Sequence, residues 1–543
     1  MTNTAGFPLL PLKFLHPYRP LALAFLSGVV MSWAAAPLNW WGLAWVALAP
    51  LWALVINPKP VALQPGRSPS SRLATLARRL ARWLTQPTAF AGAWGLGYHG
   101  CTLWWITGLH PLTWLGVPWL ASVGITLFCW LFITLWGTVP LMGWAWVLAR
   151  QGDRPTWFRL LLGVAGWCAV ETWLNLTPLS WTALSFTQSP GNVVILHLGR
   201  LSGPLLVTAV IVGINGLWAE GWHALQRQAI ARSKRLGAIA IGLLLMAHLV
   251  GFGLYAQPLG DRPEAALNLG IIQGNIPTRE KLFTNGIRRA VQEYVGGYER
   301  LAQQGVDAVL TPEGALPLFW NPATNPVRQA VLAQGVPIWL GTFVKTDRQI
   351  TQSLLAIAGN GEVVGRYNKV KLVPLGEYIP FQEVLGQLIR RLSPVEANMV
   401  PGSMHQQFDT PVGRAIASIC YESAFPALFR NQARAGGELI LTASNLDPYS
   451  EVLMAQHQAQ DLLRAIETDR WAARATNTGY SSFIDPHGHI LWRSRPLIAE
   501  RHAATIYRRQ TQTLYVRWGD WLTPSLLLSS LVAAIALHFS RSK

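Results

Sequence analysis

One cysteine in the second half of the chain stands where a nucleophile could act. Cys420 lies in the stretch 417–423 (ASICYES), at the end of an apolar, strand-like run from Arg414 to Ile419. A thiol at the tip of a buried strand, followed by a helix N-terminus, can have a lowered pKa and can lie beside backbone N–H groups that bind an oxyanion. A lone cysteine is also often an inert part of a core, so its assignment depends on the groups that accompany it.

Two charged residues follow other strand-like runs in the same half. Glu313 comes directly after Ala308–Thr311, and Lys369 comes directly after Val363–Tyr367. Alone, each would be an ordinary solvated loop residue. With Cys420 they supply a general base, a fixed cation and a thiol nucleophile, which is a complete set for acyl transfer. We therefore predict that the three converge, because such folds carry catalytic groups in the loops at strand ends.

The elements that must position these residues alternate between short apolar runs and amphipathic helices from about Ala265 to Tyr507. The expected strands are Leu267–Gln273, Ala308–Thr311, Pro337–Phe343, Leu354–Ala358, Val363–Tyr367, Arg414–Ile419, Leu439–Thr442, Ala473–Asn477 and Ser481–Ile484. The expected helices are Arg279–Gln304, Val327–Gln334 and Ser450–Arg470. This alternation predicts a layered α/β fold with a sheet core.

The composition of the remaining chain is that of a membrane protein. Of 543 residues, 51% are hydrophobic and only 13% are charged, whereas about 25% are charged in a soluble protein. Spanning helices need about 20 apolar residues, and the candidate runs are Leu21–Ala36, Trp40–Ile56, Phe90–Leu109, Leu120–Leu148, Leu160–Leu174, Leu201–Trp218, Leu236–Tyr255 and Trp521–Phe539. We therefore predict about eight helices: seven in a membrane domain (1–257) and one in a C-terminal helix with a cytoplasmic tail (519–543), flanking a catalytic domain (265–507).

Basic residues gather in every second loop between these runs. They are Lys59, Arg67, Arg72, Arg78, Arg79 and Arg82, then Arg150, Arg154 and Arg159, then Arg227, Arg232, Lys234 and Arg235. The alternate loops, around Pro37, His110 and 177–192, contain no Lys or Arg. By the positive-inside rule, the N-terminus and the last residues, Arg541 and Lys543, are cytoplasmic. The catalytic domain is then outside, which in a bacterium is the periplasm.

The formal net charge of +18 does not indicate nucleic-acid binding. Much of the excess lies in the short loops that set membrane topology, so no nucleic-acid partner is predicted.

The cysteines and histidines do not suggest a metal site. Cys101, Cys129 and Cys168 lie in apolar runs, so the catalytic domain has one thiol and cannot form an internal disulfide. His487 and His489 lie in a Pro-Gly turn, where we expect them to face solvent. No metal and no cofactor is predicted.

Three features of the apolar half have two interpretations each. The tryptophans of one outer loop either mark the membrane interface or form a rim that guides a lipid chain; they are Trp104, Trp105, Trp114 and Trp119. Glu171 is expected to pair with Arg200, as a structural pair or as a functional acid. Residues 95–100 (GLGYHG) match a dinucleotide-binding pattern, but they lie inside an apolar run with no preceding strand, which favours helix packing through small residues.

Four stretches carry a family resemblance. They are 366–380 (RYNKVKLVPLGEYIP), 419–422 (ICYE), 464–470 (RAIETDR) and 474–479 (RATNTG). Glu313, Lys369 and Cys420 also occur in the family's order, and the arrangement of spans matches. Nearly the whole chain therefore resembles the apolipoprotein N-acyltransferase family. That family is the membrane-embedded branch of the carbon–nitrogen hydrolase (nitrilase) superfamily. The resemblance implies an αββα sandwich for the outer domain and a monomer in the bacterial inner membrane.

The resemblance also implies a ping-pong reaction that ends lipoprotein maturation. Glu313 would take the proton of Cys420, whose thiolate would accept an acyl chain from a phospholipid as a thioester. Lys369 and the backbone N–H of Tyr421 would bind the oxyanion, each such donor being worth about 3–4 kcal/mol. The α-amino group of a diacylglyceryl-cysteine at the N-terminus of an apolipoprotein would then take the acyl chain. Glu377 would orient Lys369, and Glu422 would be a further required acid beside the nucleophile.

Three positions depart from the family pattern near the expected acyl pocket. Leu282 stands where a Trp is usual, so an aromatic lid role would fall to Phe283. Gln352 and Leu446 stand where Asn and Asp are usual. These changes concern chain preference more than reaction type.

Two rivals remain at this point. A membrane-tethered amidase or nitrilase would use the same three residues with water as acceptor, and the spans and the Trp-rich loop argue against it. A transporter or lipid-binding scaffold would need no intact set of catalytic groups. A Cys420 adduct with a thiol-reactive phosphonate would exclude the scaffold.

Overall fold

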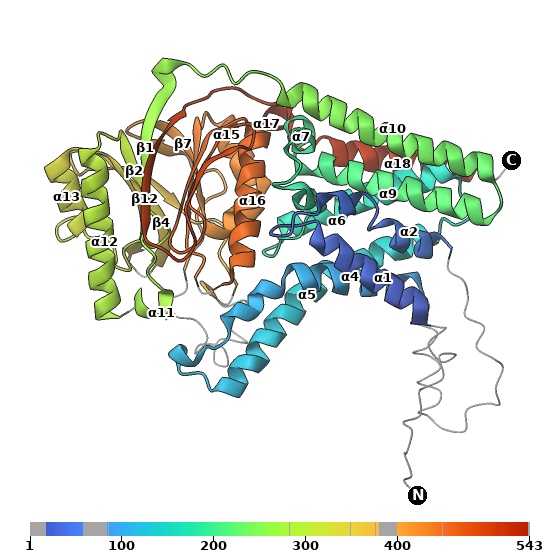
Figure 1. Cartoon of the computed structure of the whole chain (residues 1–543), viewed down its shortest axis with the longest axis horizontal. Helices are drawn as coiled ribbons and strands as arrows, with labels where there is room; N and C mark the ends of the chain where they lie inside the picture. The colour runs from blue at the N-terminus through green and yellow to red at the C-terminus, as the bar shows by residue number, and fades with distance from the viewer. Residues whose placement is uncertain are drawn as a thin grey trace, which may run out of the picture.

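The computed structural model describes residues 18–57, 84, 86–281, 283–347, 349–374, 376–378, 399–447 and 449–540. Figure 1 shows two parts, a bundle of helices and a layered α/β part, which pack against each other. The helical domain consists of α1 (Arg19–Trp33), α2 (Ala49–Ile56), α4 (Pro87–Thr102), α5 (Trp119–Ala149), α6 (Thr156–Leu176), α7 (Val193–Leu196), α8 (Gly199–Ser202), α9 (Pro204–Gln226), α10 (Ile230–Tyr255) and α18 (Leu522–Phe539). The basic loop at 59–82 lies outside the described residues, and so do Arg541 and Lys543 at the C-terminus.

Within the described residues, four helices are long and apolar enough to cross a membrane: α5, α9, α10 and α18. The expected number of about eight is therefore not confirmed. The run predicted at 40–56 is divided into a 3₁₀ turn, Trp41–Trp45, and α2, whose first turn contains Pro50. A proline is favoured in the first turn of a helix, so Pro50 suits the start of α2.

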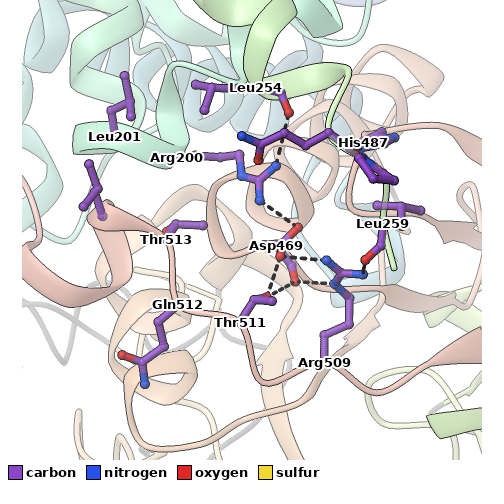
Figure 2. A pocket seen from close by; sticks show the side chains of 13 residues that line it. Arg200, Leu201, Leu254, Leu259, Asp469, His487, Arg509, Thr511, Gln512 and Thr513 are labelled. Atoms are coloured by element: carbon purple, nitrogen blue, oxygen red, sulfur yellow. Dashed lines mark hydrogen bonds and ion pairs between the residues drawn. The ribbon is translucent and has the colours of Figure 1, made fainter. Parts of the chain in front are cut away.

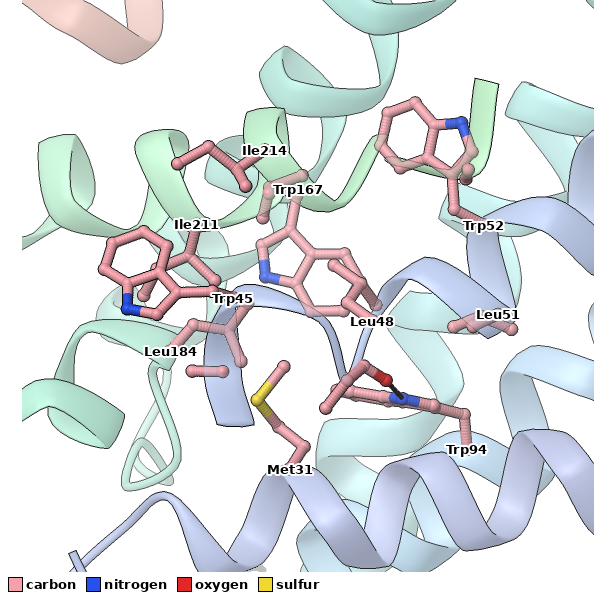
Figure 3. Packing of buried hydrophobic residues seen from close by; sticks show 14 of the residues in the cluster. Met31, Trp45, Leu48, Leu51, Trp52, Trp94, Trp167, Leu184, Ile211 and Ile214 are labelled. Carbon is pink, nitrogen blue, oxygen red and sulfur yellow. Dashed lines mark hydrogen bonds between the residues drawn. The ribbon is translucent and has the colours of Figure 1, made fainter. Parts of the chain in front are cut away.

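Tryptophan dominates the core of the helical domain, as Figure 3 shows. The rings of Trp94 and Trp167 meet edge to face with centroids 5.6 Å apart. The buried side chain of Asn215 accepts hydrogen bonds from the backbone N–H groups of Leu48 and Ala49, both at 2.9 Å. Those donors have no partner within α2, so Asn215 supplies the cap that the start of this short helix needs.

The glycines at 95–100 are packing residues, as the sequence favoured. A Cβ on Gly97 would lie 2.3 Å from the carbonyl oxygen of Phe25 in α1, and a Cβ on Gly95 would lie 2.7 Å from the side chain of Thr138 in α5. Such close approach of helices requires small residues. This stretch therefore fixes α4 between α1 and α5.

The α/β domain contains two six-stranded sheets. The first has the order β12-β1-β2-β3-β4-β5, with β1 (Ala266–Gln273), β2 (Ala308–Leu310), β3 (Ile338–Thr346), β4 (Gln349–Ile357), β5 (Val363–Asn368) and β12 (Glu500–Tyr507). The second has the order β11-β10-β9-β8-β7-β6, with β6 (Phe408–Thr410), β7 (Gly413–Ile419), β8 (Leu439–Ser444), β9 (Ala472–Thr476), β10 (Ser482–Ile484) and β11 (Ile490–Arg493). The central strands β1, β2 and β3, and likewise β7, β8 and β9, run parallel, and the outer strands are antiparallel.

The two sheets pack face to face around one apolar core, in which Leu269 and Leu310 of the first sheet lie with Ile419 and Leu441 of the second. Helices α12 (Thr284–Gln303) and α13 (Pro326–Gln334) cover the outer face of the first sheet, and α15 (Pro426–Arg434) and α16 (Glu451–Thr468) cover the second (Figure 1). This four-layer arrangement confirms the predicted nitrilase-like sandwich. The helix expected at 279–304 is divided into α11 (Thr278–Lys281) and α12.

Helix α16 lies between the second sheet and the helical domain (Figure 1). The side chain of Gln456 donates to the carbonyl oxygens of Ala36 and Thr102, at 3.2 and 3.1 Å. At the other end of α16, Asp469 is ion-paired with Arg200 at 3.2 Å. The expected pairing of Glu171 with Arg200 is therefore wrong. Glu171 is buried and accepts hydrogen bonds from Trp167, Thr208 and the N–H of Leu184 instead.

Candidate active site

Cys420 is held at the end of β7 in a conformation that few side chains adopt. Its φ is +53°, and the residues that follow it, Cys420–Ala424, form a 3₁₀ turn. A left-handed backbone costs a non-glycine residue about 1–2 kcal/mol, so the surrounding structure must impose it. Strand β7 supplies that support, because it is paired with β8 up to Ile419 opposite Ala443. The half-buried thiol lies 3.6 Å from the carbonyl oxygen of Asn445.

Three charged side chains meet beside this turn. The Nζ atom of Lys369 lies 2.8 Å from Oε1 of Glu313 and 2.6 Å from Oε1 of Glu377. Glu313 follows β2 and Lys369 follows β5, so both come from the first sheet, whereas Cys420 comes from the second. The other oxygen of Glu313 accepts from the N–H of Asn445 at 3.0 Å, next to the atom that the thiol contacts. The three residues predicted to act together thus share one site.

The charges in this site favour an ionised lysine and a protonated cysteine. Burial alone would lower the pKa of Lys369, but the carboxylates of Glu313 and Glu377 outweigh it and hold the pKa well above its usual range. Burial raises the pKa of Cys420, and Glu313 raises it further, against the opposite effect of Lys369. The expectation of a low-pKa thiol is therefore wrong. The turn that follows Cys420 is too short to lower the pKa of the thiol as the N-terminus of a long helix would. A buried thiol therefore needs a base to remove its proton.

Glu422 connects the nucleophile to the lysine segment. One of its oxygens accepts from Tyr367 Oη at 3.0 Å and from the N–H of Ile419 at 2.7 Å. The other accepts from the N–H groups of Val370 and Lys371. Glu422 is fully buried, and burial raises its pKa to about 7, although these hydrogen bonds act in the opposite direction. Its contacts are those of a positioning residue.

The helical domain reaches the residue next to the nucleophile. Tyr421 donates from its hydroxyl to the carbonyl oxygen of Pro178 at 2.8 Å and accepts from the N–H of Ser180 at 2.9 Å. Its ring stacks on Trp181, with centroids 6.0 Å apart and planes at 11°. Trp181 in turn donates to Gln456 of α16 at 2.7 Å. The loop before Leu184 therefore fixes the position of Tyr421.

Apolar side chains from both domains surround the sulfur. Leu446, Leu453 and Met454 form a small cluster, against which Cys420, Trp105, Trp181, Tyr449 and Tyr480 pack. The ring of Trp105 lies 5.4 Å from that of Trp181 and 5.2 Å from that of Tyr449. Leu446, a departure from the family pattern, is thus part of the wall beside the nucleophile. Sequence reasoning missed Trp181, which stands in a loop noted only for its lack of charge.

Among the described residues, no contact links the other predicted lipid-binding residues to Cys420. Trp104 is 57% exposed and its ring meets Trp130, while Trp119 is 58% exposed and meets His110. Trp114 is half-buried, and Phe283 is exposed. Leu282 lies outside the described residues. Gln352 is buried on β4, where its carbonyl oxygen accepts from the N–H of Lys369 at 2.8 Å.

A second lysine near the site was also missed. Lys281 is 4% exposed at the end of α11, and burial lowers its pKa to about 8, against the opposing effects of Glu313 and Asp447. The start of α11 is fixed by Asp447, which accepts from the N–H of Thr278 at 2.7 Å. The segment 278–281 (TREK) is polar throughout, so the sequence carried no signal that this lysine would be buried.

Two families match the chain in sequence, one on each domain. Residues 27–217 match the apolipoprotein N-acyltransferase N-terminal domain, and residues 268–508 match carbon–nitrogen hydrolase. A protein of Nostoc sp. named apolipoprotein N-acyltransferase is 51% identical over 92% of this chain and 95% of its own length. One of Synechocystis sp. with the same name is 44% identical over 93% of this chain and 98% of its own. An amidase from Nesterenkonia sp. AN1 is similar in structure, with a TM-score of 0.36 and 16% identity over 48% of this chain and 99% of its own.

Proposed function

This chain belongs to the apolipoprotein N-acyltransferase family, and on that premise we propose how its site works. It transfers an acyl chain from a phospholipid to the α-amino group of the N-terminal diacylglyceryl-cysteine of an apolipoprotein, the last step of lipoprotein maturation. The mechanism rests on one observation: the buried Lys369 is bound by both Glu313 and Glu377 in the site that also holds Cys420.

In the first half-reaction, Glu313 accepts the thiol proton of Cys420 as the sulfur attacks the ester carbonyl of the phospholipid. The C–S bond forms, and the carbonyl oxygen becomes an oxyanion bound by Lys369 and the backbone N–H of Tyr421. When the oxyanion collapses, the ester C–O bond breaks. Glu313 returns the proton to the leaving oxygen, so that a lysophospholipid departs and a thioester remains. Glu377 holds Lys369 in place through its 2.6 Å contact.

In the second half-reaction, the α-amino group of the lipoprotein attacks the thioester carbonyl. Glu313 accepts one proton from the amine, the C–N bond forms and the C–S bond breaks. The proton passes to the departing sulfur, which restores the thiol and releases the amide. The same base and the same oxyanion donors serve both halves, as a ping-pong reaction requires.

The apolar wall around Cys420 favours transfer over hydrolysis. Trp105 and Trp181 come from the helical domain and pack against the same cluster as the sulfur. A thioester formed there is shielded from water, and the acyl chains of both substrates can stay in the membrane. This is the specific feature that a water-using amidase would not need.

We place the enzyme in the inner membrane as a monomer, with the α/β domain (265–507) in the periplasm, the membrane domain at 1–257 and the last helix at 519–543. Helices α9 and α10 are joined, and α18 ends, on the side of the helical domain away from the sheets (Figure 1). The basic residues Arg227, Arg232 and Arg235 lie in or next to that junction. The positive-inside rule makes that side cytoplasmic.

The test is intact-protein and peptide mass spectrometry after incubation of the purified enzyme with a phospholipid. We expect one acyl mass on the peptide that carries Cys420, removed when a diacylglyceryl peptide with a free amine is added. Cys420→Ala should give no adduct, and Cys101→Ala, at an exposed cysteine of the helical domain, should behave as the unchanged enzyme. An adduct on Cys420→Ala, or transfer without any adduct, would refute the mechanism.

A further inference from the structure

A turn where the α/β domain meets the end of α10 brings together three groups that could bind a metal. Residues 485–489 (DPHGH) connect β10 to β11. One donor atom each from Asp485, His487 and His489 lie within 4.8 Å of one another. Contrary to the expectation that both histidines merely face solvent, His487 is half-buried and hydrogen-bonded.

Each of the three side chains also makes a hydrogen bond that orients it. One oxygen of Asp485 accepts from the N–H groups of His487 and His489, at 2.9 and 2.8 Å. His487 Nε2 lies 3.0 Å from the carbonyl oxygen of Gln257 and must carry a hydrogen there, so its Nδ1 has a free lone pair. His489 Nε2 lies 2.9 Å from the hydroxyl of Tyr255. Metal-binding histidines are oriented in this way through their second nitrogen.

The inner edge of the turn then presents one oxygen and two nitrogens. Oδ2 of Asp485 lies 2.9 Å from Nδ1 of His489, and the two share a proton. Nδ1 of His487 is the third donor. The His487 and His489 rings have centroids 5.9 Å apart, and two imidazoles on one zinc ion, with Zn–N near 2.0–2.1 Å, have centroids roughly 5–6 Å apart.

A buried histidine nitrogen from another part of the chain lies near these three side chains. His197 Nδ1 bonds the carbonyl oxygen of Val193 at 2.8 Å, and its buried Nε2 has no hydrogen-bond partner among the described residues. An unpaired polar atom in the interior is costly. The His197 ring lies 5.7 Å from that of His487. Its lone pair can accept from a water on a metal held by the turn, or can bind the metal itself.

His487 lines a cavity of about 410 Å³ together with Arg200, Gln257 and Arg509. Figure 2 shows His487 at its wall, near Leu254 and Leu259. This cavity lies where the end of α10 meets the α/β domain. The side chain of His489 is 46% exposed, so an ion in solution can reach the turn.

We propose that Asp485, His487 and His489 form a zinc site in this turn, beside the end of α10. Two imidazoles and one carboxylate suit Zn²⁺, whereas Mg²⁺ and Ca²⁺ prefer oxygen ligands alone. The ion takes the place of the proton between His489 and Asp485, and that proton is released. Tyr255 and Gln257, which hold the two histidines, belong to the end of α10 and the linker after it.

The experiment uses the full-length, untagged protein in detergent, stripped with EDTA and titrated with Zn²⁺ in a calorimeter. Co²⁺ is titrated in parallel, because its visible spectrum reports nitrogen ligation. We expect one equivalent of Zn²⁺ and a tetrahedral Co²⁺ spectrum. His487→Ala and His489→Ala should each lose this binding, and Tyr255→Phe should weaken it by about tenfold, as the loss of a partner that orients a ligand does.

The control is His502→Ala, at a histidine stacked on Trp492 with centroids 4.4 Å apart, outside the turn. It should bind like the unchanged protein. Each variant is also melted without metal, and Zn²⁺ should raise the melting temperature of the unchanged protein and of His502→Ala only. No binding to the unchanged protein, or undiminished binding to both turn variants, would overturn the proposal.

Discussion

At the scale of single residues, the site is organised by the charge of Lys369. Its ammonium group is buried between two carboxylates, so it can bind an oxyanion without waiting for a proton. Burial raises the pKa of the neighbouring thiol, so under the proposed mechanism the thiol stays neutral until Glu313 takes its proton. The cation and the nucleophile are then in the protonation states that the proposed first step needs.

Lys369→Met should form acyl-enzyme about a hundredfold to a thousandfold more slowly, the cost of losing one oxyanion donor. It should also destabilise the fold by about 3–5 kcal/mol, because two carboxylates are left buried without a partner. Adding Glu377→Gln should restore part of the stability and none of the activity. Acyl-enzyme is measured by mass spectrometry and stability by thermal unfolding. An acylation rate close to that of the unchanged enzyme would contradict the oxyanion role.

Glu422 makes a pH-dependent contribution to stability. Its pKa is about 7 in the folded protein against an ordinary 4.5, so the folded state binds its proton more tightly. The contribution is fully present below pH 4.5 and is lost as the pH rises through 7, a change of roughly 3 kcal/mol.

Glu422→Gln should remove this part of the pH dependence between about pH 4.5 and 7. It should also lower stability at every pH, because an amide –NH₂ would point at backbone donors such as the N–H of Ile419. The comparison is between melting temperatures of the two proteins across that range. Parallel curves would show that Glu422 does not titrate there.

At the scale of helices and strands, the local pattern of apolar and polar residues predicts the regular part of the fold. It predicts the site only in part. The strands β1, β2, β7 and β8 were predicted within a few residues, because they are apolar runs bounded by turns. The break between α11 and α12 was not, because residues 278–284 (TREKLFT) contain no proline or glycine that would mark it.

The contact between Trp181 and Tyr421 could not be predicted either, because the two residues are 240 positions apart in the sequence and belong to different domains. Local pattern carries no signal for such pairs. It placed the proposed reacting groups after strands and singled out Trp105, but it missed Trp181, which packs against the same cluster.

Trp181→Ala should leave Tyr421 less constrained and open the site to water. We expect about tenfold less acyl transfer and a larger share of free fatty acid among the products, because a truncated aromatic leaves a cavity beside the thioester. Trp181→Phe should keep most of the transfer. Trp104→Ala is the matched control, since Trp104 is exposed and packs on Trp130. An unchanged ratio of amide to fatty acid in Trp181→Ala would contradict the shielding role.

At the scale of the whole molecule, α16 connects the helical domain to the part of the α/β domain that carries Cys420. One end of the helix carries Gln456, which is bonded to Trp181 and to the ends of α1 and α4. The other end leads to Asp469, which binds Arg200 of the helical domain and Arg509 of the α/β domain. The two domains are therefore joined at both ends of one helix.

The ion-pair network at Asp469 should show an asymmetry when its members are removed. Arg200→Ala leaves Asp469 paired with Arg509, whereas Asp469→Ala leaves the guanidinium group of Arg200 without its carboxylate and that of Arg509 with Asp261 alone. Removing one partner of a buried pair costs about 3–5 kcal/mol, so Asp469→Ala should lower the melting temperature clearly more than Arg200→Ala.

Arg495→Ala provides the control for that comparison, because the ion pair of Arg495 with Glu500 is exposed and such pairs contribute about 0–1 kcal/mol. Hydrogen exchange should locate the effect: in Asp469→Ala, amides at both the end of α16 and the start of α9 should exchange faster, since one carboxylate holds both domains. Faster exchange confined to one domain would mean that the network stabilises that domain alone and does not join the two.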